Sequence, residues 1–155
     1  MRVRLTVRIE RWPIAGTFTI ARGAKTQAEV VVAKVSDGVH TGRGECVPYA
    51  RYGETVGGVM AAIEAMHAPL ADGLTREALQ ASMPAGAARN ALDCALWDFE
   101  AKVTGQPVHV LAGLPAPRAL VTAYTISLGS PDAMAEAAAQ AAAPPPKATS
   151  PPPTA

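Results

Sequence analysis

Residues 84–113, PAGAARNALDCALWDFEAKVTGQPVHVLAG, decide the fold. Their apolar positions recur with the 3.6-residue period of an α-helix, on one stripe made of Ala88, Leu92, Ala95, Leu96, Phe99 and Val103. Gly105 follows this stripe and Pro107 cannot continue a helix, so the helix is expected to end there. Alanine at positions 87, 88, 91, 95 and 101 keeps the helix thin, so it can pack close to a sheet or to another helix. The stretch therefore predicts a long core helix.

The chain has 155 residues, which gives room for one ordinary domain, or for one domain and a fragment of another. Hydrophobic residues make up 49% of it, and the net charge of +1 comes from well-mixed acids and bases. This balance favours neither a nucleic acid nor a membrane as partner. The first ten residues alternate charged and apolar side chains, so we expect no signal peptide. The two cysteines indicate reduced thiols in a cytoplasmic protein.

The first 46 residues predict a three-stranded antiparallel meander. Residues 3–10 alternate apolar with polar side chains, as a half-buried strand does. Residues 29–36 (EVVVAKVS) form the second predicted strand, and Asp37-Gly38 favours a tight hairpin turn because both residues tolerate positive φ. Residues 39–46 return as the third strand.

Glycine and proline set further expectations for these strands. Trp12-Pro13 is expected to end the first strand, because proline has no N–H to donate to a ladder. A loop over residues 14–26 would follow. Gly42 and Gly44, in the third strand, either weaken it or mark a close approach by another backbone.

Two capped helices are predicted after the meander. Thr55 can cap a helix whose apolar side chains lie within residues 56–66. Thr75 can cap a short helix, with Leu74 and Leu79 placed as a hydrophobic staple across it. Before the first of them, residues 48–54 (PYARYGE) form a loop rich in tyrosine and arginine.

The pattern changes beyond two prolines at positions 115 and 117. Residues 120–128 (LVTAYTISL) predict a strand that is buried on both sides. Ser130-Pro131-Asp132 then starts a helix over residues 133–143, with a cap, a proline at the first helical position and an acid in the first turn. A strand followed directly by a helix is the first step of a parallel βα unit.

Three stretches of the sequence resemble the enolase superfamily: GECVPYARYGET (44–55), LTREALQ (74–80) and PAGAARNALDCALWDFEAK (84–102). Within the superfamily, the chain is similar to the mandelate racemase/muconate lactonizing enzyme group, and most similar to the bacterial L-Ala-D/L-Glu dipeptide epimerases. The resemblance covers about residues 1–143.

The resemblance implies an α+β fold. Residues 1–115 are expected to form the enolase-like N-terminal capping domain, a three-stranded meander plus helices. Residues 118–143 match the first strand and helix of an incomplete, truncated (β/α) barrel. Residues 144–155 hold six prolines and no apolar side chain larger than proline, so they predict a disordered Pro/Ala-rich tail. A shift of reading frame near codon 143 would account for such a tail.

The family that the chain resembles carries out 1,1-proton transfer next to a carboxylate, with Mg²⁺ holding the charge of the intermediate. In its dipeptide epimerases, two lysines and three acidic metal ligands lie on later barrel strands. None of those positions is present here, and Lys147 stands alone in the proline-rich tail. No catalytic or metal-binding residue is therefore assigned, and the 155-residue chain alone is expected to be inactive.

The resemblance does assign substrate contacts. Arg22, in FTIARG, matches an arginine that binds the glutamate side-chain carboxylate, which suits a guanidinium fork. Tyr52, with Tyr49 in the same loop, is placed to close over the site. Thr125 lies near the carboxyl end of the first barrel strand and matches a substrate-contacting threonine. The alternatives, a solvated arginine and tyrosines that only pack their own loop, stay open.

Other chemistry-bearing residues have structural explanations. The three histidines, at positions 40, 67 and 109, are too scattered for a set of metal ligands. Asp98 and Lys102 form an i,i+4 ion pair on the long helix.

The leading hypothesis is the N-terminal part of a dipeptide epimerase of murein peptide metabolism, whose substrate is a dipeptide. One alternative is a fragment of another enolase-superfamily cycloisomerase or racemase. A second alternative, from a different class, is a non-catalytic binding domain with a proline-rich tail. The sequence leaves open whether the protein forms a homo-oligomer.

Overall fold

The computed structural model describes residues 3–21 and 23–142. Contacts within the chain divide it into two compact units, Met1–Pro13 with Gln27–Ala119 and Ile14–Thr26 with Leu120–Ala155. The domain ranges 1–115, 118–143 and 144–155 stay predictions, and the last of them lies outside the described residues. Among the described residues, no helix has both the length and the apolar composition needed to cross a membrane.

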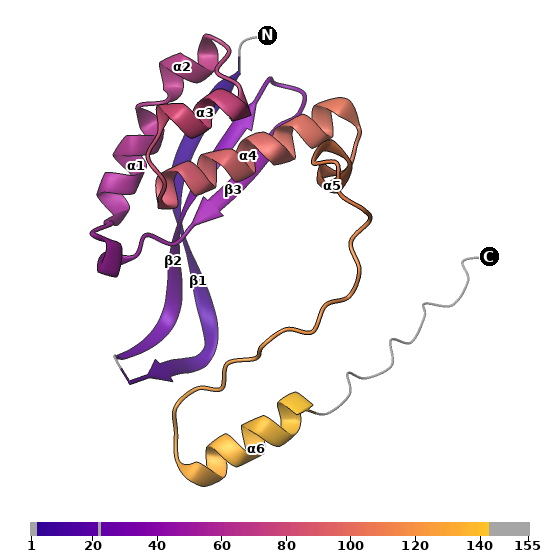
Figure 1. Ribbon diagram of the computed structural model, residues 1–155. Coiled ribbons are helices and arrows are strands. Elements are labelled where there is room, and N and C mark those ends of the chain that lie inside the picture. Colours follow the sequence, from indigo (N-terminus) through magenta and orange to yellow (C-terminus); the bar gives the residue numbers. More distant parts are fainter. Residues whose placement is uncertain (1–2, 22, 143–155) are drawn as a thin grey trace, which may run out of the picture. The chain divides into compact units, whose positions relative to one another are not determined.

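The predicted antiparallel meander is confirmed (Figure 1). It consists of β1 (Arg4–Ile20), β2 (Gly23–Ser36) and β3 (Thr41–Cys46), in the spatial order β1-β2-β3. The pairing of β2 with β3 runs from Val31 opposite Cys46 to Ser36 opposite Thr41. One face of β2 carries Val31, Ala33 and Val35, which all belong to the hydrophobic core.

The first two strands are longer than predicted. β1 continues through Trp12 and Pro13 to Ile20, and β2 already begins at Gly23, so the predicted loop over residues 14–26 is mostly strand. The expected stop at Pro13 was wrong because β1 lies at the edge of the sheet. An edge strand has one side without a pairing partner, where the missing N–H of proline costs no ladder bond.

The hairpin between β2 and β3 is confirmed, but its turn is not the predicted two-residue turn. Residues 37–40 form the connection, and of these only Gly38 has a positive φ, of 96°. The Asp37 carboxylate accepts hydrogen bonds from the N–H groups of Val39, at 2.8 Å, and His40, at 2.7 Å. Asp37 therefore shapes the turn through its side chain instead of through a left-handed backbone.

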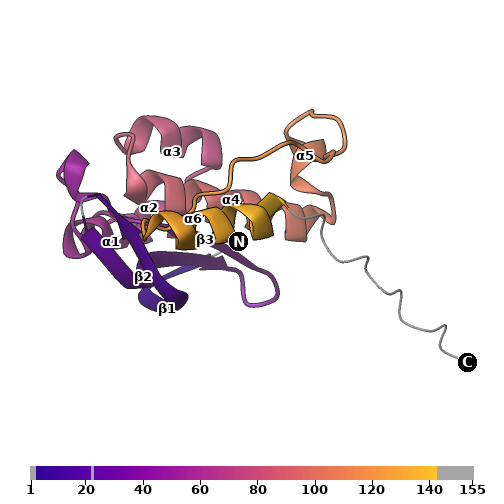
Figure 2. The same cartoon turned by 90° about the horizontal axis from the view of Figure 1, so that it is seen from below.

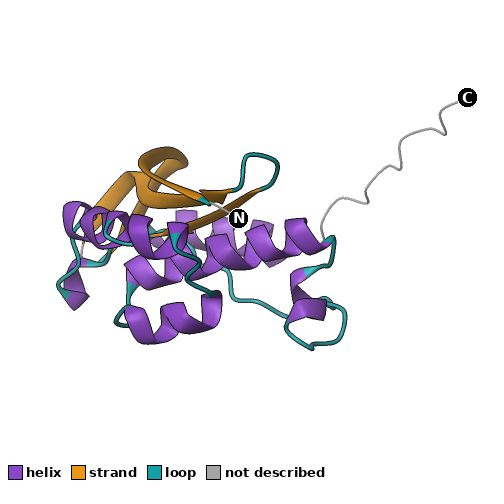
Figure 3. Cartoon of the chain, turned by 90° about the horizontal axis from the view of Figure 1, so that it is seen from above, coloured by secondary structure: helices purple, strands orange, loops and turns teal. Residues whose placement is uncertain are grey.

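Five helices and one 3-10 turn follow the sheet in the first unit. They are η1 (Ala50–Tyr52), α1 (Val56–Glu64), α2 (His67–Ala71), α3 (Arg76–Ser82), α4 (Ala87–Thr104) and α5 (Val108–Leu111). Both predicted threonine caps form: Thr55 Oγ1 accepts from Gly58 N at 3.1 Å, and Thr75 Oγ1 from Ala78 N at 3.2 Å. Figures 2 and 3 show α1 to α4 on the same side of the sheet.

The contact between α4 and β3 is a contact of two backbones. A Cβ on Gly44 would lie 2.6 Å from the Ala95 nitrogen and closer still to the Ala91 carbonyl oxygen. A Cβ on Gly42 would lie 2.6 Å from the Phe99 Cβ and closer still to the Ala95 carbonyl oxygen. Of the two interpretations of these glycines, close backbone approach is the correct one. On the helix side, the small side chains of Ala91 and Ala95 allow the same close approach.

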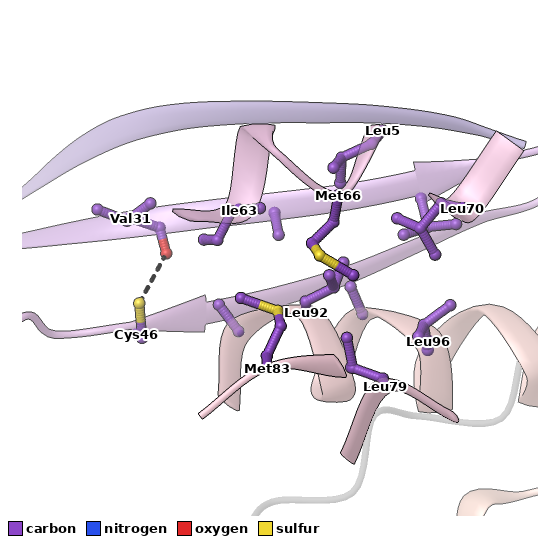
Figure 4. Close-up of a cluster of buried hydrophobic side chains, with 14 of the residues drawn as sticks. Leu5, Val31, Cys46, Ile63, Met66, Leu70, Leu79, Met83, Leu92 and Leu96 are labelled. Atoms are coloured by element: carbon purple, nitrogen blue, oxygen red, sulfur yellow. Dashed lines mark hydrogen bonds between the residues drawn. The ribbon is translucent and has the colours of Figure 1, made fainter. Parts of the chain in front are cut away.

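The core lies between the sheet and the helices (Figure 4). From α4 it takes Ala91, Leu92, Ala95, Leu96 and Phe99, which confirms most of the predicted stripe. Val103, the last predicted member, is 41% exposed. The reason is the length of β3. Gly44 faces Ala91 and Ala95, and Gly42 faces Ala95 and Phe99. Val103, one helical turn further on, therefore lies beyond Thr41, the first residue of the strand. Gly105 caps α4 in the left-handed conformation, as predicted.

The predicted strand over residues 120–128 does not form. Leu120 is 78% and Tyr124 is 76% exposed. A strand is stabilised by pairing with neighbouring strands, and the barrel strands that would flank this one are not among the described residues. The helix after it, α6 (Pro131–Ala142), is confirmed, and Ser130 Oγ accepts from Ala133 N at 3.3 Å.

We predict that Gly44→Ala lowers the free energy of unfolding by about 3 kcal/mol, because backbone atoms of α4 occupy the space of the new methyl group. The measurement is a urea unfolding curve. Gly57→Ala is the matched control: Gly57 lies in α1 with nothing near its missing Cβ, so this change should raise the free energy by about 0.5 kcal/mol. Equal effects of the two changes would contradict the backbone contact.

We also predict that the two free cysteines differ in reactivity. Burial raises the pKa of the Cys46 thiol to about 11, so about one thiol in a thousand is ionised at pH 8. Cys94 is exposed on α4, and burial raises its pKa less strongly. Iodoacetamide at pH 8 should therefore modify Cys94 first, as followed by peptide mass spectrometry. Equal rates in the folded chain would contradict this, and equal rates in denaturant are the control.

Candidate functional site

The predicted substrate-contact residues belong to both units of the chain. Tyr52 lies in the first unit and Thr125 in the second. Arg22 lies outside the described residues, so its assignment stays a prediction from the sequence.

Tyr52 lies in a loop that we call the tyrosine loop, residues 48–54. η1 forms inside it: Tyr52 N donates to Tyr49 O at 2.9 Å, and Gly53, with a φ of 74°, closes the turn. The rings of Tyr49 and Tyr52 contact each other, with centroids 5.6 Å apart and planes tilted by 48°. Tyr52 is nevertheless 77% exposed. The loop thus presents an aromatic pair at the protein surface, which is the chemistry needed to cover an apolar part of a ligand.

Glu54, at the end of the tyrosine loop, ties the loop to the start of α4. Its Oε2 accepts from Tyr49 N at 2.9 Å, and its Oε1 accepts from Ala87 N at 2.6 Å. The hydrogen bonds from the backbones of Ala87 and then Tyr49 hold the pKa of this carboxyl below its ordinary value. Two hydrogen bonds accepted at once, one by each oxygen, favour the ionised form of the carboxyl.

Sequence reasoning missed Glu54, although one signal was present. α4 begins after Gly86, which has no side chain to cap a helix, so its first N–H groups need an acceptor from elsewhere. A glutamate 33 residues earlier in the sequence cannot be identified as that acceptor without the fold.

In the second unit, Ser127 joins the residues around Thr125 to the end of β1. Ser127 Oγ accepts from Thr19 N at 2.9 Å and donates to Thr17 O at 3.1 Å. Next to it, Leu128 N donates to Thr19 O at 2.9 Å. Thr125 is exposed and lies two residues before this serine. The structure thus connects the segment carrying Thr125 to the last residues of β1. This connection was not predicted, because a serine in an apolar run does not indicate which residues it will contact.

Polar residues on α4 are engaged in structural contacts. The predicted pair of Asp98 and Lys102 is confirmed at 2.7 Å, and Asp98 also accepts from Arg43 N at 2.8 Å. The His40 ring lies 3.3 Å from Asp37, in the hairpin turn. Within residues 3–21 and 23–142, no three His, Cys, Asp or Glu side chains gather as they would around a metal ion.

One shallow polar pocket of about 350 Å³ lies where α3 meets the start of α4. Its polar groups bond to one another: Gln80 donates to Asp93 at 2.8 Å, and Arg89 donates to the carbonyl oxygen of Gln80 at 3.1 Å. These bonds leave the pocket with a structural role, holding the two helices together.

The chain has informative similarities to known proteins. The family model of the mandelate racemase/muconate lactonizing enzyme N-terminal domain matches residues 2–113. The L-Ala-D/L-Glu epimerase of Escherichia coli is 49% identical over 129 residues, which are 83% of this chain and 40% of the epimerase. The chain therefore spans less than half the length of this relative.

Two solved structures show the same relation. One is an enolase family member from Agrobacterium tumefaciens with homology to dipeptide epimerases, solved with sodium and L-Ala-L-Glu. It is 55% identical, has a TM-score of 0.82, and the match covers 89% of this chain and 42% of that one. The other is a dipeptide epimerase from Enterococcus faecalis complexed with Mg and L-Leu-L-Tyr, which is 25% identical with a TM-score of 0.76 and matches over 90% and 42% of the two chains.

The meander, the helices packed on one of its faces and the match over residues 2–113 agree with one another. The chain belongs to the mandelate racemase/muconate lactonizing enzyme family of the enolase superfamily, and it contains the N-terminal capping domain of that family.

Proposed function

We propose that this chain provides the capping domain of a cytoplasmic dipeptide epimerase that acts on L-Ala-D/L-Glu. The observation that carries the proposal is the 49% identity to the E. coli L-Ala-D/L-Glu epimerase over 129 residues. The A. tumefaciens relative, solved with L-Ala-L-Glu, supports the same substrate class. The complete enzyme would move the α-proton of the substrate's second residue, in murein peptide metabolism.

In this proposal the capping domain selects the substrate. Arg22 pairs with the side-chain carboxylate of the glutamate, since a guanidinium and a carboxylate bind through two parallel hydrogen bonds. Tyr52, which is exposed beside Tyr49, covers the dipeptide, and the hydroxyl of Thr125 binds a polar group of the peptide. Specificity is thus built on loops held by a rigid scaffold.

Proton transfer and Mg²⁺ binding belong to other parts of the complete enzyme. The E. faecalis relative was solved with Mg, but the described residues of this chain offer no cluster of ligands that fits the ion. The catalytic bases and metal ligands of the complete enzyme would lie in the barrel.

The test is a chimera in which residues 1–128 replace the matching part of the E. coli epimerase. We expect this chimera to epimerise L-Ala-L-Glu, measured as incorporation of deuterium at the α-carbon of glutamate in D₂O. Dipeptides without a side-chain carboxylate should be poorer substrates. A folded chimera that prefers those dipeptides, or that turns over none of them, would count against the proposal.

In the same chimera, Arg22→Met should lower kcat/KM for L-Ala-L-Glu roughly ten- to a hundredfold, because a charge-assisted hydrogen-bond pair is lost. Turnover of L-Ala-L-Gln, which lacks the side-chain carboxylate, should change much less. Arg118→Met, at an exposed position outside the proposed site, is the matched control. If both arginine variants behave alike, Arg22 is a solvated loop residue.

The 155-residue chain by itself should be inactive. Incubated with Mg²⁺ and L-Ala-L-Glu in D₂O, it should leave the α-proton signals of the dipeptide unchanged in the NMR spectrum. Deuterium incorporation that depends on Mg²⁺ would show that the bases and metal ligands are present after all.

A further inference from the structure

The two oxygens of the Glu54 carboxylate bind two different parts of the first unit. Oε1 lies 2.6 Å from Ala87 N, in the first turn of α4, and Oε2 lies 2.9 Å from Tyr49 N, in the tyrosine loop. The backbone of Glu54 adds a third contact, since its own N–H donates to Tyr49 O at 3.4 Å. Each of the two residues thus donates a backbone hydrogen bond to the other, and these bonds hold Tyr49 and Glu54 together across the tyrosine loop.

We call these two hydrogen bonds of the Glu54 carboxylate, to Ala87 N and to Tyr49 N, the Glu54 bridge. Two neighbouring glycines accommodate it. Gly86 precedes Ala87 with a φ of 157°, and a Cβ at Gly86 would lie 3.0 Å from Glu54 Oε1. Glycine at this position thus gives the carboxylate room to reach the start of the helix. Gly53, with a φ of 74°, turns the chain out of η1 directly before Glu54.

A helix cap alone does not explain this geometry. Capping α4 requires an acceptor for Ala87 N, which Oε1 provides. The second oxygen and the backbone N–H of Glu54 both serve the tyrosine loop instead. α4 is also the element packed most closely on the sheet, through Gly42 and Gly44, so it is a rigid anchor for a loop.

We propose that Glu54 is a positioning residue, which fixes the tyrosine loop to α4 and so holds Tyr49 and Tyr52 in place for the substrate. Glu54 itself touches no substrate in this proposal and acts through the loop. The bridge stands on the geometry alone, whereas its use in substrate selection rests on the proposed function.

The bridge is tested on the 155-residue chain by amide hydrogen exchange, followed residue by residue by NMR. Glu54→Met keeps the length of the side chain and removes both acceptors. We expect the Tyr49 and Ala87 amides to exchange roughly ten- to a hundredfold faster, as for loss of a hydrogen bond to a charged group. The contact between the two tyrosine rings should weaken as well. Glu64→Gln, at an exposed position of α1, is the control.

Two outcomes would overturn the proposal. Unchanged exchange at Tyr49, with faster exchange at Ala87 alone, would reduce Glu54 to a helix cap. Unchanged exchange at both amides would remove the bridge altogether. If Glu54→Met fails to fold, Glu54→Gln decides instead. Its NH₂ group cannot accept, so in a real bridge one of the two amides must lose its partner and exchange faster, and unchanged exchange at both amides would overturn the proposal.

Substrate selection is tested separately, in the chimera with the E. coli barrel. Glu54→Gln should raise KM for L-Ala-L-Glu and leave kcat within about twofold, because the bases and metal ligands are untouched. Unchanged KM with faster exchange at Tyr49 would show a bridge without a role in binding, and would overturn the positioning role. If the chimera without the Glu54 substitution is already inactive, while Tyr49 in the 155-residue variant exchanges faster, the result would instead count against the proposed function.

Discussion

The fold depends on the contact between the backbone of β3 and the backbone of α4. Gly42 and Gly44 leave no Cβ between the strand and the helix, and Ala91 and Ala95 present the smallest side chains that a helix can offer. This approach puts the larger side chains of α4, such as Leu92, against the rest of the core. In a close fit of this kind an added methyl group is destabilising, because most of the neighbouring atoms belong to a backbone that cannot rotate away.

Other contacts attach further elements to α4. Asp98 accepts from Arg43 N and Lys102 donates to Thr41 O, so two side chains of the helix bind the backbone of the strand and fix its register. On another side of the helix, Arg76 of α3 lies over the Trp97 ring, 3.4 Å from its centroid, and bonds to Glu100. Glu54 attaches the tyrosine loop to the N-terminal end of α4. The helix is thus the common support of the sheet, of α3 and of a loop.

Features that depend on local chemistry could be predicted from the sequence. The 3.6-residue stripe of α4, the glycine at its end and the caps Thr55 and Thr75 involve residues within a few positions of each other. The extension of β1 through Pro13 could not be predicted, because it depends on that strand lying at the edge of the sheet. The strand expected at 120–128 failed for the same kind of reason, since strand formation requires partners supplied by other segments.

In the candidate site, too, the sequence indicated individual residues but not the long-range contacts that hold them. Tyr52 and Thr125, which the resemblance assigns as substrate contacts, both lie on exposed segments, and the resemblance could not show what holds those segments. Glu54 reaches across 33 residues of sequence and Ser127 across 108, and each uses a single polar side chain to bind backbone groups of a distant segment. Such anchors leave the glycine contact between β3 and α4 untouched. Loop sequences can therefore change, and with them the substrate, while the scaffold that supports the loops stays the same.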